Sequence, residues 1–202
     1  MIYPSHIHLT LKIINGLGLQ VADKEIISLL GSSGCGKSTL LNLLAGLLVP
    51  QAGKISVTGE CVYQTQTVTL LPYQTALENA LFACELRGLV TVALKQKALQ
   101  LFALFNLGEA TKKKFPNELS GGMRQRIAII QTLLVEAGLY LLDEPFNAID
   151  RATVLTISDY MWKKVKDQNA SAMMVTHDLE QIILLSDRVV LMPNSTVLTS
   201  RK

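Results

Sequence analysis

Residues 31–38 constrain this chain more than any other stretch, because they read G-S-S-G-C-G-K-S between two apolar segments. The run 26–30 before them has the composition of a buried strand, and the run 39–44 after them suits a helix. The three glycines permit turns and close approaches that a Cβ atom would hinder, so backbone N–H groups can point inward at the helix start, where the helix dipole favours an anion. A glycine-rich turn before an ordinary helix explains the glycines but not the Lys-Ser pair at this offset. The pattern predicts a phosphate-binding loop.

The polar residues of this loop suit a nucleotide with Mg²⁺, and we expect ATP and Mg²⁺ as cofactors. Lys37 would reach the β- and γ-phosphates, and the Ser38 hydroxyl would complete the Mg²⁺ shell. The predicted nucleotide-binding residues are Gly31, Ser32, Ser33, Gly34, Cys35, Gly36, Lys37, Ser38 and Thr39.

Length and composition fit one globular domain, with 202 residues of which 49% are hydrophobic and 17% charged. No apolar run approaches the roughly 18 residues of a membrane span, and residues 1–10 lack a signal-peptide pattern. We therefore expect a cytoplasmic protein that reaches a membrane only through a partner. The net charge of +3 is small, and the basic clusters at 112–114 and 163–166 lack interleaved aromatic residues, so no nucleic-acid partner is expected.

The order of predicted elements indicates an α/β fold. Strand and helix patterns alternate in the first and last thirds, which implies a mostly parallel sheet with helices on its faces, whereas the middle is helical. The expected strands are 6–13, 17–21, 26–30, 54–58, 61–63, 139–142, 173–176 and 189–192. The expected helices are 75–86, 92–107, 122–136, 152–166, 179–185 and one running from the loop to about residue 48.

A pair of carboxylates follows the apolar run 139–142, where Asp143 and Glu144 precede Pro145. A buried parallel strand that ends in acids places them at the carboxyl edge of the sheet, where nucleotides bind in open α/β folds. Asp143 is suited to hold Mg²⁺ or its waters, and Glu144 to activate the attacking water as general base. A surface turn can also carry Asp-Glu-Pro, but so apolar a strand rarely ends this way in a chain that already has a phosphate loop.

A second anion-binding pattern lies at 119–126, which reads L-S-G-G-M-R-Q-R. Ser120, Gly121 and Gly122 offer a hydroxyl and bare N–H groups at the positive end of a helix dipole. As helix capping alone the pattern would be ordinary, but together with the phosphate loop it is specific.

In this order the motifs resemble those of the ATP-binding subunits of ABC transporters, over nearly the whole chain. Residues 31–38 match Walker A, 139–144 match Walker B, 119–125 match the ABC signature and 147–150 match the D-loop. The resemblance assigns Asp150 to the nucleotide site and makes His177 the switch histidine at the γ-phosphate. It also implies one domain, 1–202, with a P-loop NTPase core, an N-terminal antiparallel β-subdomain (core and β-subdomain at 1–66 and 120–202) and an inserted helical subdomain at about 67–119.

The family implies that two such subunits, as homodimer or heterodimer, sandwich two ATP molecules head to tail. Ser120 and Gly122 of one chain would grip the γ-phosphate bound by Lys37 of the other, and hydrolysis would energise solute transport through transmembrane permease subunits at the inner face of the membrane. The tracts around Met123 and Phe146 resemble importers of the nitrate, sulfonate and taurine type. Lipid- or lipoprotein-handling ABC ATPases share part of this pattern, and a soluble non-transport ABC ATPase is a further alternative.

Two assignments stay open. The Q-loop glutamine, a catalytic residue and metal ligand in the family, is Gln64 or Gln66, and the aromatic residue that precedes Gln64 favours the former. The residue that stacks on adenine is Tyr3, His6 or His8. The transported solute, and whether it is imported or exported, are not encoded in these motifs.

Overall fold

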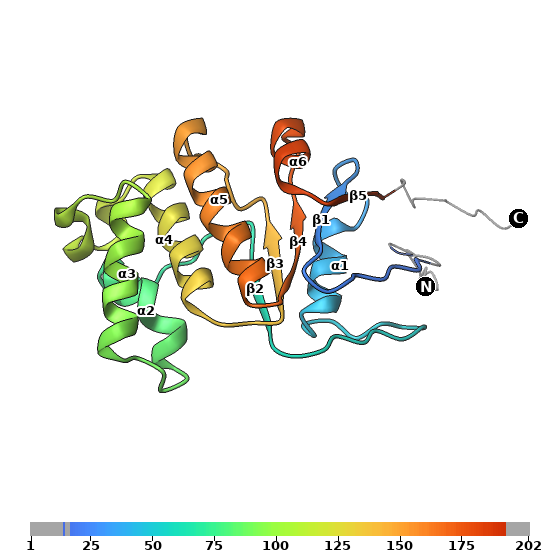
Figure 1. Cartoon of the computed structure of the whole chain (residues 1–202), viewed down its shortest axis with the longest axis horizontal. Coiled ribbons are helices and arrows are strands. Elements are labelled where there is room, and N and C mark those ends of the chain that lie inside the picture. The colour runs from blue at the N-terminus through green and yellow to red at the C-terminus, as the bar shows by residue number, and fades with distance from the viewer. Residues whose placement is uncertain (1–13, 15–16, 193–202) are drawn as a thin grey trace, which may run out of the picture.

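A parallel sheet of five strands in the order β2-β3-β4-β1-β5 forms the centre of the protein in the computed structural model, which describes residues 14 and 17–192 (Figure 1). Every ladder is parallel. The strands are β1 Ile26–Leu30, β2 Cys61–Gln64, β3 Leu139–Asp143, β4 Ser171–Val175 and β5 Arg188–Leu191. The helices are α1 Lys37–Leu44, α2 Ala76–Glu85, α3 Val92–Leu104, α4 Gly121–Leu134, α5 Arg151–Asp167 and α6 Leu179–Leu185, with short 3₁₀ turns at Glu109–Lys113 and Pro116–Glu118. Because all strands run the same way, their carboxyl ends meet at one edge of the sheet.

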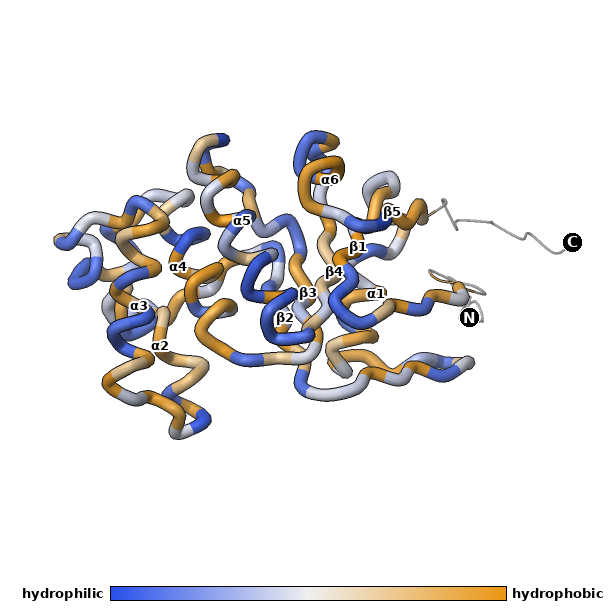
Figure 2. The backbone as a smooth tube through the Cα atoms, viewed as in Figure 1, coloured by the Kyte–Doolittle hydropathy of each residue, from blue (hydrophilic) through white to orange (hydrophobic). Residues whose placement is uncertain are grey.

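Helices cover both faces of this sheet. Leu40 and Leu41 of α1 pack with Leu139 and Leu141 on one face, in a core that the strands share. On the other face, Leu142 belongs to a larger core with apolar residues of α2, α3, α4 and α5. Figure 1 shows α2 and α3 at one end of the molecule, beyond α4, and Figure 2 shows hydrophobic residues recurring along all three helices. The core therefore continues from the sheet into the helical region.

Most elements agree with the sequence prediction, but α1 is shorter. Gly46 adopts φ 72° and donates its N–H to Leu43 O at 3.2 Å, while the Leu47 N–H returns to Asn42 O at 2.9 Å. A left-handed glycine with such returning bonds ends a helix. The helix thus stops at Leu44 rather than near residue 48. The proposed limits of a helical subdomain, about 67–119, stay a prediction.

The prediction of an N-terminal antiparallel β-subdomain is wrong for the part of the chain that the structure describes. Residues 17–21 and 54–58 form no strand, and 6–13 lie outside the described residues. Residues 61–64 join the main sheet instead, with Cys61 opposite Leu139 in a parallel ladder. Leu19, Val21 and Val57 still pack on the α1-side core. Segments of strand-like composition can thus pack on the core without forming a strand, because a strand also needs a hydrogen-bonding partner, which composition does not specify.

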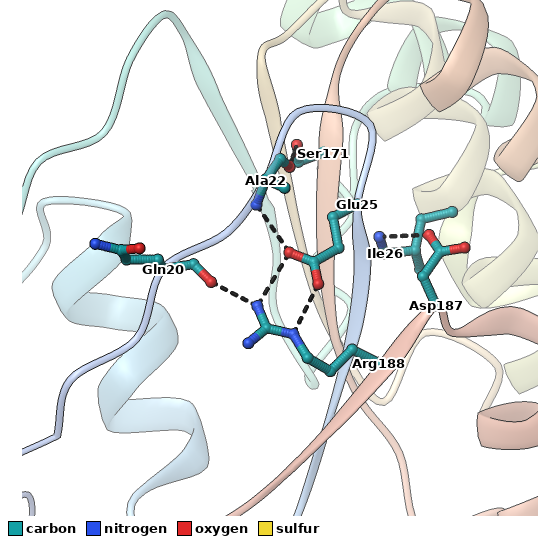
Figure 3. A network of polar contacts seen from close by, with 7 residues as sticks. All are labelled: Gln20, Ala22, Glu25, Ile26, Ser171, Asp187 and Arg188. Carbon is teal, nitrogen blue, oxygen red and sulfur yellow. Dashed lines mark hydrogen bonds and ion pairs between the residues drawn. The ribbon is translucent and has the colours of Figure 1, made fainter.

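Polar contacts tie the amino ends of the strands together (Figure 3). The Arg188 guanidinium donates to both carboxylate oxygens of Glu25, at 2.7 and 3.0 Å, and to Gln20 O at 2.5 Å. The Ser171 hydroxyl donates to Ala22 O at 2.8 Å, and Asp187 accepts from the Ile26 N–H at 2.9 Å. We call this set the amino-edge network. It fixes the segment before β1 to the starts of β4 and β5.

None of the helices within the described residues combines the length and the hydropathy needed to cross a bilayer.

Candidate nucleotide-binding site

The loop between β1 and α1 has the backbone that its glycines predict. Gly34 and Gly36 have φ of 79° and 105°, in the left-handed region where glycine is strongly favoured. Gly31 is needed for space, because a Cβ atom there would lie 2.7 Å from both Cys35 Sγ and Met192 O. The loop thus curves tightly into the amino end of α1, whose first residues are Lys37, Ser38 and Thr39.

Lys37 is buried at the start of α1, and its ammonium lies over the loop. Nζ donates to Gly31 O at 2.7 Å and to Ser32 O at 3.0 Å. Two backbone carbonyls therefore stabilise a charge that would otherwise be costly to bury. An anion that enters the loop would meet an ammonium already positioned there.

The two predicted acids lie at the carboxyl end of β3, and both are buried. Asp143 is the last residue of the strand. Glu144 follows with φ 51°, and its N–H donates to Val175 O at 2.9 Å, which anchors this turn to β4. A left-handed non-glycine residue costs of order 1–3 kcal/mol and persists only where the surrounding structure holds it.

Glu144, the predicted general base, is paired with His177, the predicted switch histidine. His177 Nε2 lies 2.9 Å from Glu144 Oε1. Burial raises the pKa of the Glu144 carboxyl; the nearby Asp143 charge raises it further, while His177 and Lys37 act in the opposite direction. A carboxylate with a raised pKa is a stronger base, so this environment suits proton abstraction from water. Because the Lys37 charge acts on Glu144, the phosphate loop and these acids lie near each other.

Gln64, at the end of β2, is 5% exposed, and neither its amide nitrogen nor its amide oxygen has a hydrogen-bond partner. Gln66 is exposed. Burying an amide without hydrogen-bond partners costs free energy, and a ligand that supplies those partners would recover it. Of the two candidates for the Q-loop glutamine, Gln64 is the one with unsatisfied polar atoms near the acids.

The residues present fit a magnesium nucleotide. Mg²⁺ in nucleotide sites is held by one or two protein carboxylates, together with phosphates and waters, rather than by a cage of protein ligands. Asp143 would supply the carboxylate, Ser38 the hydroxyl and Gln64 an unpartnered amide. Tyr3, His6 and His8, the candidates for stacking on adenine, lie outside the described residues.

The signature segment packs on the loop after β3. Ser120 caps α4 by accepting from the Met123 N–H at 3.2 Å, and Gly121 and Gly122 form its first turn. A Cβ atom on Gly122 would lie 2.4 Å from Ala148 O, so only glycine permits this approach, whereas one on Gly121 would meet nothing closer than 4.0 Å.

Asp150, in the predicted D-loop, lies at the start of α5, after the same loop. It caps α5 by accepting from the Thr153 N–H at 3.0 Å. Gln125 of α4 donates to Pro145 O at 2.7 Å, which joins the signature helix to the same loop. The predicted residues thus form two groups that share the loop after β3: the phosphate loop with the acids and His177, and the signature with Asp150.

Sequence reasoning missed Tyr63 as part of the site. Its hydroxyl lies 3.5 Å from Asp143 Oδ2, and burial together with the Asp143 charge raises the pKa of Tyr63 to about 12. The only signal in the sequence was its place next to Gln64, and the contact itself follows from the register of β2 on β3.

Residues 14–147 match the family model described as ABC transporter. The chain belongs to this family. It is 38% identical over 191 residues to the bicarbonate transport ATP-binding protein CmpC of Synechocystis sp., an alignment that covers 90% of this chain and 28% of CmpC. It is 35% identical to the aliphatic sulfonates import ATP-binding protein SsuB of Corynebacterium glutamicum, with 93% of this chain and 77% of that protein covered. The chain thus spans less than a third of the length of CmpC and about three quarters of that of SsuB.

A similar solved structure is titled as the dimeric, post-hydrolysis state of the ATP-binding cassette MJ0796 bound to ADP and Pi. It superposes with a TM-score of 0.81 at 26% identity, covering 91% of this chain and 87% of that one. The sheet and the flanking helices described above are therefore those of an ABC ATP-binding cassette.

Proposed function

We propose that this chain is the ATP-binding and ATP-hydrolysing subunit of an ABC transporter, and that the transporter is an importer of the nitrate, sulfonate and bicarbonate type. The observation that carries the catalytic part is the 2.9 Å pair of Glu144 and His177 beside a buried Lys37. A phosphate loop alone would indicate binding, whereas a buried carboxylate of raised pKa supplies the base that hydrolysis needs. The importer type is supported by the similarity to CmpC and SsuB.

Each group then has a role in hydrolysis. The loop N–H groups and Lys37 would bind the phosphates, while Ser38, Asp143 and Gln64 would hold Mg²⁺ or its waters. The metal, when bound, offsets phosphate charge. Glu144 accepts a proton from the attacking water, and His177 keeps its carboxylate oriented toward the γ-phosphate. Burial of Glu144 restricts its carboxylate to this position.

A second ATP-binding subunit completes the site in this proposal. Gly121 and Gly122 lie next to Ala148 of their own chain, whereas Ser120 is exposed and available to another chain's nucleotide. The dimeric title of the similar cassette supports a paired arrangement. Closure of the pair around ATP would move permease subunits at the cytoplasmic face of the membrane.

The decisive experiment replaces the proposed base. Glu144→Gln keeps the shape of the side chain but removes the base, so ATP turnover should fall by roughly 10²–10⁴-fold. Because the phosphate contacts are retained, ATP-dependent association should persist, as measured by light scattering with and without ATP. Glu136→Gln removes a carboxylate from an exposed position and should change neither quantity. Unchanged turnover in Glu144→Gln would refute Glu144 as the base.

A further inference from the structure

Two neighbouring residues of β2 lie on opposite faces of the sheet at the nucleotide edge. Tyr63 is paired with Leu141 of β3, and Gln64 with Leu142. Paired residues of a parallel ladder share a face, and so do residues two apart in a strand. Tyr63 therefore lies on the same face as Asp143, which is the face covered by α1. Gln64 lies on the face toward the helical region.

The Tyr63 hydroxyl approaches the carboxylate of Asp143. Its oxygen is 3.5 Å from Asp143 Oδ2, longer than the roughly 2.7–2.8 Å of a well-formed hydroxyl bond. Within the described residues, this hydroxyl is the only hydrogen-bond donor that reaches the buried carboxylate. The phenol hydroxyl carries a proton that it can donate, and the ionised carboxylate offers only acceptor oxygens.

Packing alone does not require a hydroxyl here. The ring of Tyr63 is half-buried against the α1-side core, and a phenylalanine would make the same apolar contacts. The hydroxyl instead lies against the carboxylate that the proposed function assigns to Mg²⁺. Carboxylates that bind metals are commonly oriented by hydrogen bonds from neighbouring groups, whose loss weakens metal binding about 10–100-fold.

We propose that Tyr63 is a positioning residue for the metal site: its hydroxyl fixes one oxygen of Asp143, so that the other faces the Mg²⁺ position beside Ser38. The inference rests on the proposed function, since it needs a magnesium nucleotide in the loop. It adds that the strand carrying Gln64 also sets the geometry of the metal ligand.

The test removes only the Tyr63 hydroxyl and measures the affinity of the protein for a divalent metal ion. Mn²⁺ replaces Mg²⁺, and free Mn²⁺ is counted by electron paramagnetic resonance during titration of the protein with a non-hydrolysable ATP analogue present. Tyr63→Phe should weaken Mn²⁺ binding about 10-fold. Binding of a fluorescent ATP analogue in EDTA should be unchanged, because the phosphate loop is intact. Tyr160→Phe, which removes the hydroxyl of another half-buried tyrosine outside the site, should match the wild type in both measurements.

Turnover gives a second measurement that a merely structural role would not reproduce. In Tyr63→Phe, the Mg²⁺ concentration for half-maximal ATPase activity should rise about 10-fold, while kcat at saturating Mg²⁺ stays near that of the wild type. A fall in kcat at every Mg²⁺ concentration, with the Mg²⁺ dependence unchanged, would overturn the proposal, as would wild-type Mn²⁺ affinity. If the wild-type chain bound no nucleotide, the proposed function would fail first and this inference with it. Wild-type nucleotide binding with an unaltered variant would overturn the inference alone.

Discussion

Charged groups are paired at the amino edge of the sheet, whereas like charges are adjacent at its carboxyl edge. At the amino ends of the strands, Glu25 pairs with Arg188 through two contacts, and Asp187 accepts from both the Ile26 N–H and Lys166. At the carboxyl ends, Asp143 and Glu144 are adjacent carboxylates whose charges disfavour each other. Gln64 has two polar atoms without partners there.

The polar groups at the amino edge therefore stabilise the fold, whereas those at the carboxyl edge are available to bind a ligand. The amino-edge network satisfies its own groups, and each such partly exposed pair contributes little, typically below about 1 kcal/mol. A buried polar group without a partner instead costs about 1–3 kcal/mol. A magnesium nucleotide that bound at the carboxyl edge would supply the missing partners and so recover this free energy.

The largest effect is expected where the signature helix approaches the loop after β3. Gly122→Ala places a Cβ atom 2.4 Å from Ala148 O, which forces the helix start or the loop to move. Such overpacking typically costs about 1–3 kcal/mol, and ATP-dependent association should fall with it. Thermal unfolding should show a melting temperature lower by about 2–4 °C for each kcal/mol.

Gly121→Ala is the matched control for this substitution, because its Cβ would lie 4.0 Å from Ala148 Cβ, which is an ordinary van der Waals distance. Both variants add one methyl group to the first turn of α4. An equal loss of stability in the two would show that the close approach at Gly122 is not what requires glycine.

A smaller effect, of opposite sign, is expected at Gln64. Gln64→Met replaces the unpartnered amide by an apolar side chain of similar length and should stabilise the protein by about 1 kcal/mol in the absence of nucleotide. ATPase activity should fall, because the amide proposed to sense the metal is gone. Denaturant unfolding without magnesium nucleotide measures the gain in stability, and unfolding with it measures the loss of stabilisation by the ligand.

Gln66→Met provides the comparison, since that residue is exposed and should change neither stability nor activity. If Gln66→Met abolished ATPase activity and Gln64→Met did not, the Q-loop assignment would move to Gln66. A destabilised Gln64→Met would show that the amide has a partner in solution.

Much of this arrangement could be predicted from the sequence, because it depends on residues close together in the chain. The phosphate loop is specified by glycines and a Lys-Ser pair within eight residues, and the structure has the expected strand, left-handed glycines and helix. The apolar run before Asp143 likewise forms the fully buried β3. Local composition specifies such elements, and parallel topology then brings their ends to one edge.

The parts that could not be predicted depend on contacts between distant segments. Strand-like composition predicted strands at 17–21 and 54–58, but composition does not specify a pairing partner, and apolar residues of these segments pack on the core without a strand ladder. The Tyr63–Asp143 contact requires the register of β2 on β3. The need for glycine at 122 depends on the position of Ala148 O, more than twenty residues away.

The smallest effect is expected at the amino edge. Glu25→Gln removes the charge that pairs with Arg188, and should cost about 0.5–1 kcal/mol at pH 7 without changing nucleotide affinity. The hydrogen bonds from Arg188 lower the pKa of Glu25 below its usual 4.5. The stabilisation is therefore fully present above pH 4.5 and is lost as the pH falls through the lowered pKa, so the difference between variant and wild type should shrink in acid.

Glu109→Gln is the control for the loss of one negative charge, since Glu109 is 89% exposed in its pair with Lys112, against 16% for Glu25. It should change stability by less than about 0.5 kcal/mol at any pH. Urea unfolding at pH 7 and pH 4 measures both variants, and a fluorescent ATP analogue measures affinity. An altered nucleotide affinity in Glu25→Gln would mean that the two edges are coupled through the strands, and that the separation of stabilising from ligand-binding charges is incomplete.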